Sequence, residues 1–145
     1  KIREMGVSNY TASQFEALQT AVPFPIATHQ PEFSCWHLAP LRDGVLDQCL
    51  QHRLTPLAWS PLARGLLGLE PAAARAEPQG ERLAALIACL DEIAGREDVS
   101  RTAVALAFVL VHPAGAIPII GTQNPARIRE SAAALRVGLT RQDWY

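Results

Sequence analysis

Short apolar runs alternate with longer amphipathic segments along the 145 residues of this chain. The runs are too short for helices, and proline, glycine or small polar residues border each of them. They predict four strands, at positions 5–7, 26–30, 56–60 and 116–120. Apolar residues at helical spacing recur between and after these runs. They predict helices at 11–20, 45–52, 80–97, 100–111 and 124–135.

Capping residues support several of these helices. Thr11 and Gln14 have the spacing of a capping box, and we expect Phe15 and Leu18 to face inward from the helix that follows. The apolar stripe at positions 45, 46, 49 and 50 predicts the buried face of the next helix. Further N-caps are expected at Ser100, Asn124 and Thr140.

The order of these elements predicts parallel strands joined by helical crossovers. Segment 63–80 carries glycine, proline and alanine without a clear period, and we expect it to be a long loop. The remaining connections have the lengths of βαβ units. This pattern leaves two architectures open, an open doubly wound sheet and half of an eight-stranded β/α barrel.

In both architectures, functional groups gather where the strands end at their carboxyl termini. Four polar pairs fall there, namely Ser8-Asn9, His29-Gln30, Trp59-Ser60 and Gly121-Thr122. Such a set can hydrogen-bond an amide, flank a flat ring and donate to phosphate, but it supplies no obvious nucleophile. The pattern is therefore typical of a binding surface more than of a catalytic centre.

A candidate anion site lies after the last predicted strand. Gly121 makes a turn, and Asn124-Pro125 opens a helix whose N-terminal N–H groups and dipole favour an anion. Arg127, one turn into that helix, is suited to pair with a phosphate through two hydrogen bonds.

Composition and charge exclude several classes of partner. With 13 basic and 14 acidic residues, the net charge of -1 gives no attraction for nucleic acid or for an anionic membrane surface. Lys1 is the single lysine, so no internal lysine can serve a mechanism. The longest apolar stretch, 103–111, is about half of what spans a bilayer. The three cysteines form no CxxC pair and are interpreted as reduced thiols packed as small apolar side chains. Without a targeting segment, we expect a cytoplasmic protein.

Five segments together resemble the aldo-keto reductases. They are 6–10 (GVSNY), 30–34 (QPEFS), 58–62 (AWSPL), 117–122 (IPIIGT) and 127–130 (RIRE). Their order and spacing are similar to those of this family along essentially the whole chain. The resemblance implies a (β/α)8 TIM barrel of which residues 1–145 are the second half, strands five to eight with their helices. It also implies a reductase that passes a hydride from NADPH to a small-molecule carbonyl substrate, with NADP as the cofactor.

The resemblance also implies a role for individual residues. Ser8, Asn9 and Gln30 match the side chains that hold the nicotinamide carboxamide, and Trp59 matches the aromatic residue stacked on the nicotinamide. Ser60 and Leu62 match contacts to the pyrophosphate. The adenosine end is matched by Gly121, Thr122, Arg127 and Glu130, of which the first three fall on the segment that grips the 2′-phosphate.

Two departures from the family pattern affect these implied roles. Many members have Lys-Ser where this chain has Gly121-Thr122, so one phosphate-binding charge is absent and Arg127 carries more of the interaction. His29 stands where Asn is common, and we interpret it as a histidine packed beside a strand end.

The catalytic Asp, Tyr, Lys and His of the family lie on or after strands two to four, which this chain does not contain. We therefore predict no catalytic residue here. The chain is expected to be a partial sequence that is inactive alone and that requires the missing N-terminal half-barrel. An alternative is a non-catalytic half-barrel module that binds a nucleotide or a protein. A flavodoxin-like receiver is a third interpretation, but it would need an acidic cluster in place of Ser8-Asn9.

Overall fold

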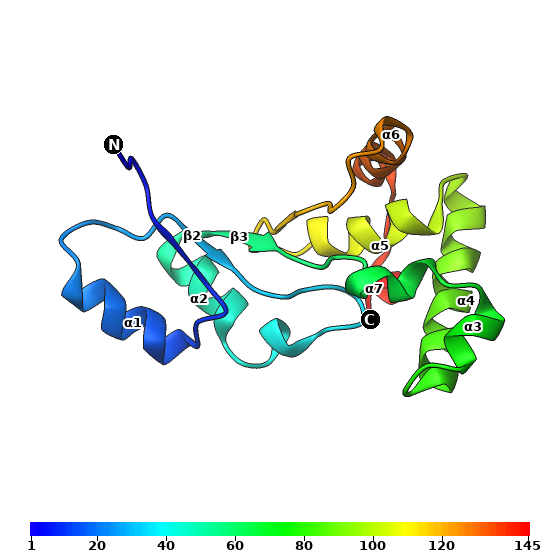
Figure 1. Cartoon of the computed structure of the whole chain (residues 1–145), viewed down its shortest axis with the longest axis horizontal. Helices are drawn as coiled ribbons and strands as arrows, with labels where there is room; N and C mark the ends of the chain where they lie inside the picture. Colours follow the sequence, from blue (N-terminus) through cyan, green and yellow to red (C-terminus); the bar gives the residue numbers. More distant parts are fainter.

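The structure, a computed structural model, describes all residues from 1 to 145. Its four parallel strands are β1 (Gly6–Ser8), β2 (Thr28–Gln30), β3 (Thr55–Ala58) and β4 (Ile117–Pro118). They pair in sequence order, so β1 and β4 are the two edges of the sheet (Figure 1). A doubly wound sheet reverses its strand order at a switch point, whereas successive strands of a β/α barrel do not. The observed order has no such reversal, as is the case for successive strands of a β/α barrel.

Helices connect the strands as the sequence predicts. The α-helices are α1 (Ala12–Ala21), α2 (Val45–His52), α3 (Pro71–Arg75), α4 (Gly80–Glu97), α5 (Arg101–Leu110), α6 (Pro125–Ala132) and α7 (Arg141–Trp144). Short 3-10 helices are η1 (Ala39–Leu41), η2 (Ala63–Gly68) and η3 (Ala133–Arg136). None of the helices combines the length and the apolar content needed to cross a bilayer.

The predicted caps are confirmed. Thr11 and Gln14 form a complete capping box, and Thr140 forms a second one with Asp143. The Ser100 hydroxyl accepts the N–H of Ala103, and the Asn124 side chain accepts the N–H of Ala126. These bonds satisfy backbone donors that have no partner inside the first helical turn.

Three predictions about individual segments are wrong. Segment 63–80 is not a loop throughout, because it contains η2 and α3. Its buried members Ala63, Leu67 and Ala74 pack on α4. This tertiary contact stabilises the two short helices, although the segment has no helical period of apolar residues. Leu50 is 46% exposed, and Gln48 is buried in its place because its side chain reaches the carbonyl of Ala12 in α1. The strand predicted at 116–120 has only two paired residues.

The two faces of the sheet differ in exposure. Along β3 and β4, the alternating residues Pro56, Ala58 and Ala116 are buried beneath the helices. On the opposite face Leu57 is partly buried, and Ile117 and Ile119 are 50% and 37% exposed. Gly6 lies on this second face in register with Thr28, and a Cβ at Gly6 would come within 2.9 Å of the Thr28 carbonyl oxygen. The close approach of β1 to β2 thus requires glycine.

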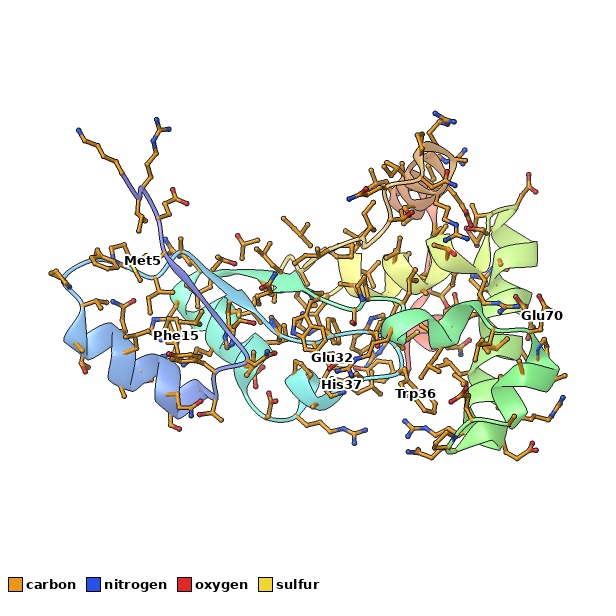
Figure 2. The ribbon with its side chains drawn as sticks, viewed as in Figure 1. Met5, Phe15, Glu32, Trp36, His37 and Glu70 are labelled. Atoms are coloured by element: carbon orange, nitrogen blue, oxygen red, sulfur yellow. The ribbon has the colours of Figure 1, made fainter.

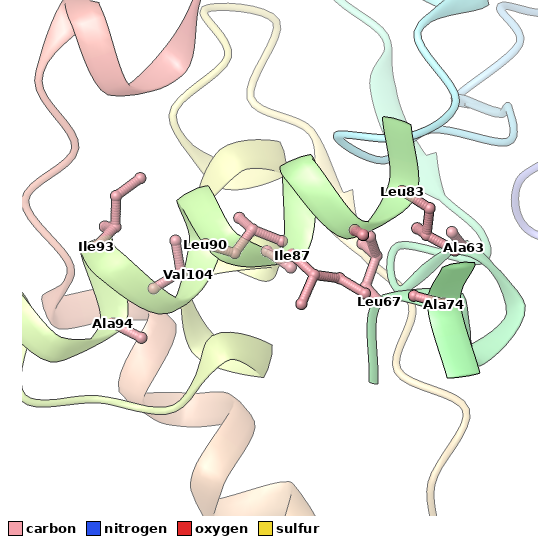
Figure 3. Packing of buried hydrophobic residues seen from close by; sticks show 11 residues of the cluster. Ala63, Leu67, Ala74, Leu83, Ile87, Leu90, Ile93, Ala94 and Val104 are labelled. Atoms are coloured by element: carbon pink, nitrogen blue, oxygen red, sulfur yellow. The ribbon is translucent and has the colours of Figure 1, made fainter. Parts of the chain in front are cut away.

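The largest hydrophobic cluster lies along α4 (Figure 3). Leu83, Ile87 and Leu90 form the continuous inner stripe of that helix, and Leu67 and Ala74 pack on it from η2 and α3. A smaller cluster of Phe15, Ile26, Cys49 and Leu54 joins α1 and α2 to the segments that lead into β2 and β3. The segment after β3 is therefore anchored on the larger core.

Candidate functional site

Hydrogen bonds join the ends of β1 and β2 directly. The Ser8 hydroxyl donates to the Gln30 carbonyl oxygen at 3.0 Å, and the Asn9 backbone N–H donates to the same oxygen at 3.2 Å. Asn9 has a left-handed backbone, with φ of 55°, which asparagine tolerates better than most residues. The turn places the Asn9 side chain at the carboxyl end of the strands.

Trp59 bridges from β3 to this pair of strands. Its indole Nε1–H donates to Asn9 Oδ1 at 2.8 Å, across the end of β2. Its backbone is held as well, because the Trp59 N–H donates to the Pro31 carbonyl at 3.0 Å. The structure therefore brings together Ser8, Asn9, Gln30 and Trp59, which the sequence analysis predicted to act together.

A charged pair completes this group of strand ends. Arg64 donates to Glu32 at 3.1 Å, and its guanidinium carbon lies 5.3 Å from the centre of a Trp59 ring. The sequence analysis did not single out these two residues as functional. Their signals were present, since Glu32 belongs to the QPEFS segment and Arg64 follows AWSPL by two residues.

A polar pocket of about 430 Å³ opens beside these side chains. Its wall includes Asn9, Trp59, Glu32, Arg64 and His37. Figure 2 shows Glu32 and His37 in the middle of the molecule, between α1 and the α3–α4 region. A larger apolar pocket of about 540 Å³ lies instead within the helical layer, between η1, α4 and α7.

His29 is packed beneath this region, as predicted. The side chain is fully buried and stacks on Phe15, with ring centres 6.4 Å apart. Neither ring nitrogen has a hydrogen-bond partner within the chain. Burial lowers the pKa of His29, and nearby Asp43 opposes that shift. The imidazole therefore contributes to the core in its neutral form.

The segment after β3 contains the other predicted contacts on this side. Ser60 has a left-handed backbone, with φ of 49°, and its carbonyl accepts the Ala63 N–H at 2.8 Å. Leu62 is partly buried and packs against the hydrophobic clusters of α4 and α5. Its side chain thus serves the core, which leaves the backbone of this turn for any contact to a ligand.

The remaining predicted residues lie at a second place, around the start of α6. Gly121, Arg127 and Glu130 are exposed, and no residue of α6 is buried. Hydrogen bonds there are local, such as the Asn124 N–H donating to Thr122 Oγ1 at 3.2 Å. Arg127 forms no ion pair within the chain, so its guanidinium is free to receive an anion.

Other reactive side chains do not assemble into a site. Burial raises the pKa of Cys35 to about 12 and that of Cys49 to about 11, so both thiols stay protonated near neutral pH. Cys89 is exposed, which differs from the buried packing predicted for the cysteines. No group of three or more His, Cys, Asp and Glu side chains is placed to hold a metal ion.

A family model described as "Aldo/keto reductase family" matches residues 1–145. The chain belongs to this family. The predicted resemblance is thereby confirmed over the full length of the sequence.

Characterised relatives and solved structures agree with this assignment. The chain is 45% identical over all 145 residues to 6-dehydroglucose reductase of Novosphingobium aromaticivorans, and 36% identical to the enzyme of that name in Agrobacterium fabrum. It covers 45% of each, so it spans about half the length of these relatives. A crystal structure of a thermostable aldo-keto reductase with the inhibitor epalrestat is 28% identical, with a TM-score of 0.76. That match covers 99% of this chain and 46% of the solved one.

Proposed function

We propose that residues 1–145 form the C-terminal half of an NADP-dependent aldo-keto reductase domain, comprising strands five to eight of a (β/α)8 barrel. In this proposal the chain supplies the cofactor-binding half of a reductase that acts on a small-molecule carbonyl substrate. Relatives named 6-dehydroglucose reductase support a carbonyl compound as the substrate class. The partner of this half would be the N-terminal half-barrel.

The observation that carries the proposal is the hydrogen bond between Trp59 Nε1 and Asn9 Oδ1 at 2.8 Å. It fixes the edge of a flat ring beside a cluster of amide and hydroxyl groups at the carboxyl ends of the strands. An aromatic platform next to such groups fits a nicotinamide ring with its carboxamide.

The unused hydrogen-bonding groups at this place match a carboxamide. With Oδ1 engaged by the indole, the Asn9 side-chain NH₂ remains free to donate to a carboxamide oxygen. Ser8 already donates its proton to Gln30, so its oxygen is left to accept from a carboxamide NH₂. The Gln30 side-chain amide has no partner in the chain and supplies both a donor and an acceptor.

The start of α6 supplies complementary chemistry for the adenosine end. Arg127 is exposed and unpaired, and a bidentate hydrogen bond from its guanidinium would suit the 2′-phosphate that distinguishes NADP from NAD. Gly121 and Thr122 lead into the helix N-terminus, where the dipole favours an anion. Glu130, also exposed, lies one turn further along α6.

When bound, NADPH would supply the hydride that reduces the carbonyl carbon. This chain's own residues would orient the nicotinamide and bind the phosphates. A proton donor to the carbonyl oxygen would come from the other half of the barrel. In this proposal neither tyrosine of the chain is that donor: Tyr10 lies between β1 and α1, and Tyr145 follows α7.

Fluorescence titration of the protein containing this chain tests the proposal. NADPH should quench tryptophan emission, and the Trp59→Phe variant should lose most of that quenching. Trp36→Phe is the matched control, because Trp36 packs under Arg82 away from the strand ends and should leave the quenching intact. Absence of quenching in the unsubstituted protein would contradict the proposal.

A further inference from the structure

The segment from Ser60 to Leu69, which we term the 60–69 loop, has an unusual backbone. Ser60, Ala63 and Arg64 all have positive φ, at 49°, 50° and 56°, and Gly65 follows at 95°. Residues other than glycine rarely adopt positive φ. Several of them in one short segment keep this conformation only where the surrounding structure stabilises it. Ser60 follows Trp59 directly in the sequence, and the Arg64 guanidinium carbon lies 5.3 Å from the centre of a Trp59 ring, so both link the loop to the proposed nicotinamide platform.

One side chain holds the far end of this loop. Arg101, the first residue of α5, donates from Nη1 to the carbonyl oxygen of Leu69 at 2.7 Å and to that of Leu67 at 3.3 Å. Its Nε and Nη2 donate to the two carboxylate oxygens of Asp91 in α4, at 2.6 and 2.8 Å. The Arg101 side chain is 19% exposed.

Two features indicate that this arrangement is more than a surface ion pair. A cation in the first turn of a helix opposes the helix dipole, so Arg101 is unfavourable for α5 itself unless its contacts offset that cost. The bidentate geometry also uses the planar fork of arginine, which the single ammonium group of lysine cannot reproduce together with two carbonyl contacts.

We propose that Arg101, oriented by Asp91, is a positioning residue that fixes the conformation of the 60–69 loop for cofactor binding. Neither residue touches the cofactor in this scheme. Arg101 acts through the backbone of Leu67 and Leu69, and the loop then presents Ser60 to the pyrophosphate and Arg64 to the Trp59 ring. The predicted effect of Arg101 on cofactor binding rests on the proposed function. The predicted effect of Arg101 on the conformation of the 60–69 loop does not depend on it.

The chain offers a matched control on the neighbouring helix α4, which also carries Asp91. Arg96 of α4 also forms a bidentate pair, with Asp143 at 3.0 and 2.8 Å, but that pair holds the C-terminal helix α7 and makes no contact with the 60–69 loop. Arg101→Met and Arg96→Met therefore remove the same chemistry from two different segments.

Limited trypsin digestion measures local opening of the 60–69 loop in the absence of cofactor. Arg64 is exposed within the loop, so cleavage after Arg64, mapped by mass spectrometry, reports local opening. We expect Arg101→Met to accelerate this cleavage about tenfold and Arg96→Met to leave it unchanged, a factor equivalent to about 1.4 kcal/mol. Asp91→Asn and Arg101→Lys, which preserve more of the packing, should accelerate the cleavage by smaller factors and serve if Arg101→Met does not fold.

Binding of NADPH is measured in parallel on the protein that contains this chain. The Kd should rise about tenfold in Arg101→Met and stay unchanged in Arg96→Met. Unchanged cleavage after Arg64 in folded variants at Arg101 and Asp91 would overturn the positioning role, as would equal acceleration in Arg96→Met. Faster cleavage with no NADPH binding even in the unsubstituted protein would support the loop contact while contradicting the proposed function.

Discussion

The two regions proposed to bind the cofactor are built differently. At the ends of β1, β2 and β3, the side chains of Asn9 and Trp59 come from segments 50 residues apart and hydrogen-bond each other. At the start of α6, the hydrogen bonds join residues two to four positions apart, and no residue of the helix is buried. Figure 1 shows α6 standing away from the strands.

This difference separates a preorganised region from a locally determined one. Substitutions among the linked side chains at the strand ends disturb one another, because residues that share partners do not act additively. A substitution on the exposed face of α6 should leave the fold unaffected and, under the proposed function, should change one contact to the cofactor. The proposed nicotinamide and adenosine ends should therefore respond to substitution in distinguishable ways.

The largest expected effect on cofactor binding is at the adenosine end. Arg127→Ala should weaken NADPH binding by about 2 kcal/mol, roughly thirtyfold, because a charge-assisted hydrogen bond to phosphate is lost. NADH binding and the melting temperature should not change, since Arg127 makes no ion pair in the chain. Titration with both nucleotides measures this, with Arg129→Ala on the same helix as the control. Equal loss for NADPH and NADH would contradict the assigned phosphate contact.

A glycine-to-alanine substitution should lower the free energy of unfolding at the strands more than at the start of α6. Gly6→Ala brings a Cβ against the Thr28 carbonyl and should destabilise the fold by about 1–3 kcal/mol through overpacking. Gly121→Ala meets no atom within 4 Å and should change stability by less than about 0.5 kcal/mol. Chemical denaturation of the two variants measures the difference. A larger loss in Gly121→Ala would mean that the start of α6 is more constrained than its contacts indicate.

A smaller effect is expected from the shared amide at the nicotinamide end. Asn9→Ala removes the acceptor of the Trp59 indole and should weaken NADPH and NADH equally, by about 1 kcal/mol or roughly fivefold. The equality follows because both nucleotides carry the same nicotinamide. The ratio of the two Kd values is the internal control. A loss of affinity for NADPH alone would contradict the proposed contact between Asn9 and the nicotinamide.

A pH dependence of stability is expected beneath the strand ends. Burial lowers the pKa of His29 below its ordinary value of 6.5, so the unfolded chain binds the proton more readily. Stability should therefore be complete above about pH 6.5 and decrease as pH falls below it, with a slope of at most about 1.4 kcal/mol per pH unit for one proton. Denaturation of His29→Leu should lack this component, whereas His37→Gln should retain it. An unchanged slope in His29→Leu would assign the dependence to another group.

The sequence alone determined the order of the four strands and of the longer helices, and where those helices begin. Thr11, Ser100, Asn124 and Thr140 mark helix starts because a capping side chain acts within one turn, and the structure places a helix after each of them. Ser8, Asn9, Gln30 and Trp59 could be predicted as neighbours, since parallel strands bring their carboxyl ends to one edge. The helical structure of η2 and α3 could not be predicted, because it depends on contacts with α4 and not on a periodic pattern within the segment.

Only the tertiary structure decided which side chains at these strand ends act on one another. The spacing of Asn9 and Trp59 in the sequence does not predict their hydrogen bond. The sequence likewise does not predict that Arg64 pairs with Glu32, or that Arg101 donates to the carbonyls of Leu67 and Leu69. Local patterns encode dihedral preference and the direction of burial. The choice of partner depends on register and on the packing of distant helices, which fix distances that the linear sequence leaves free.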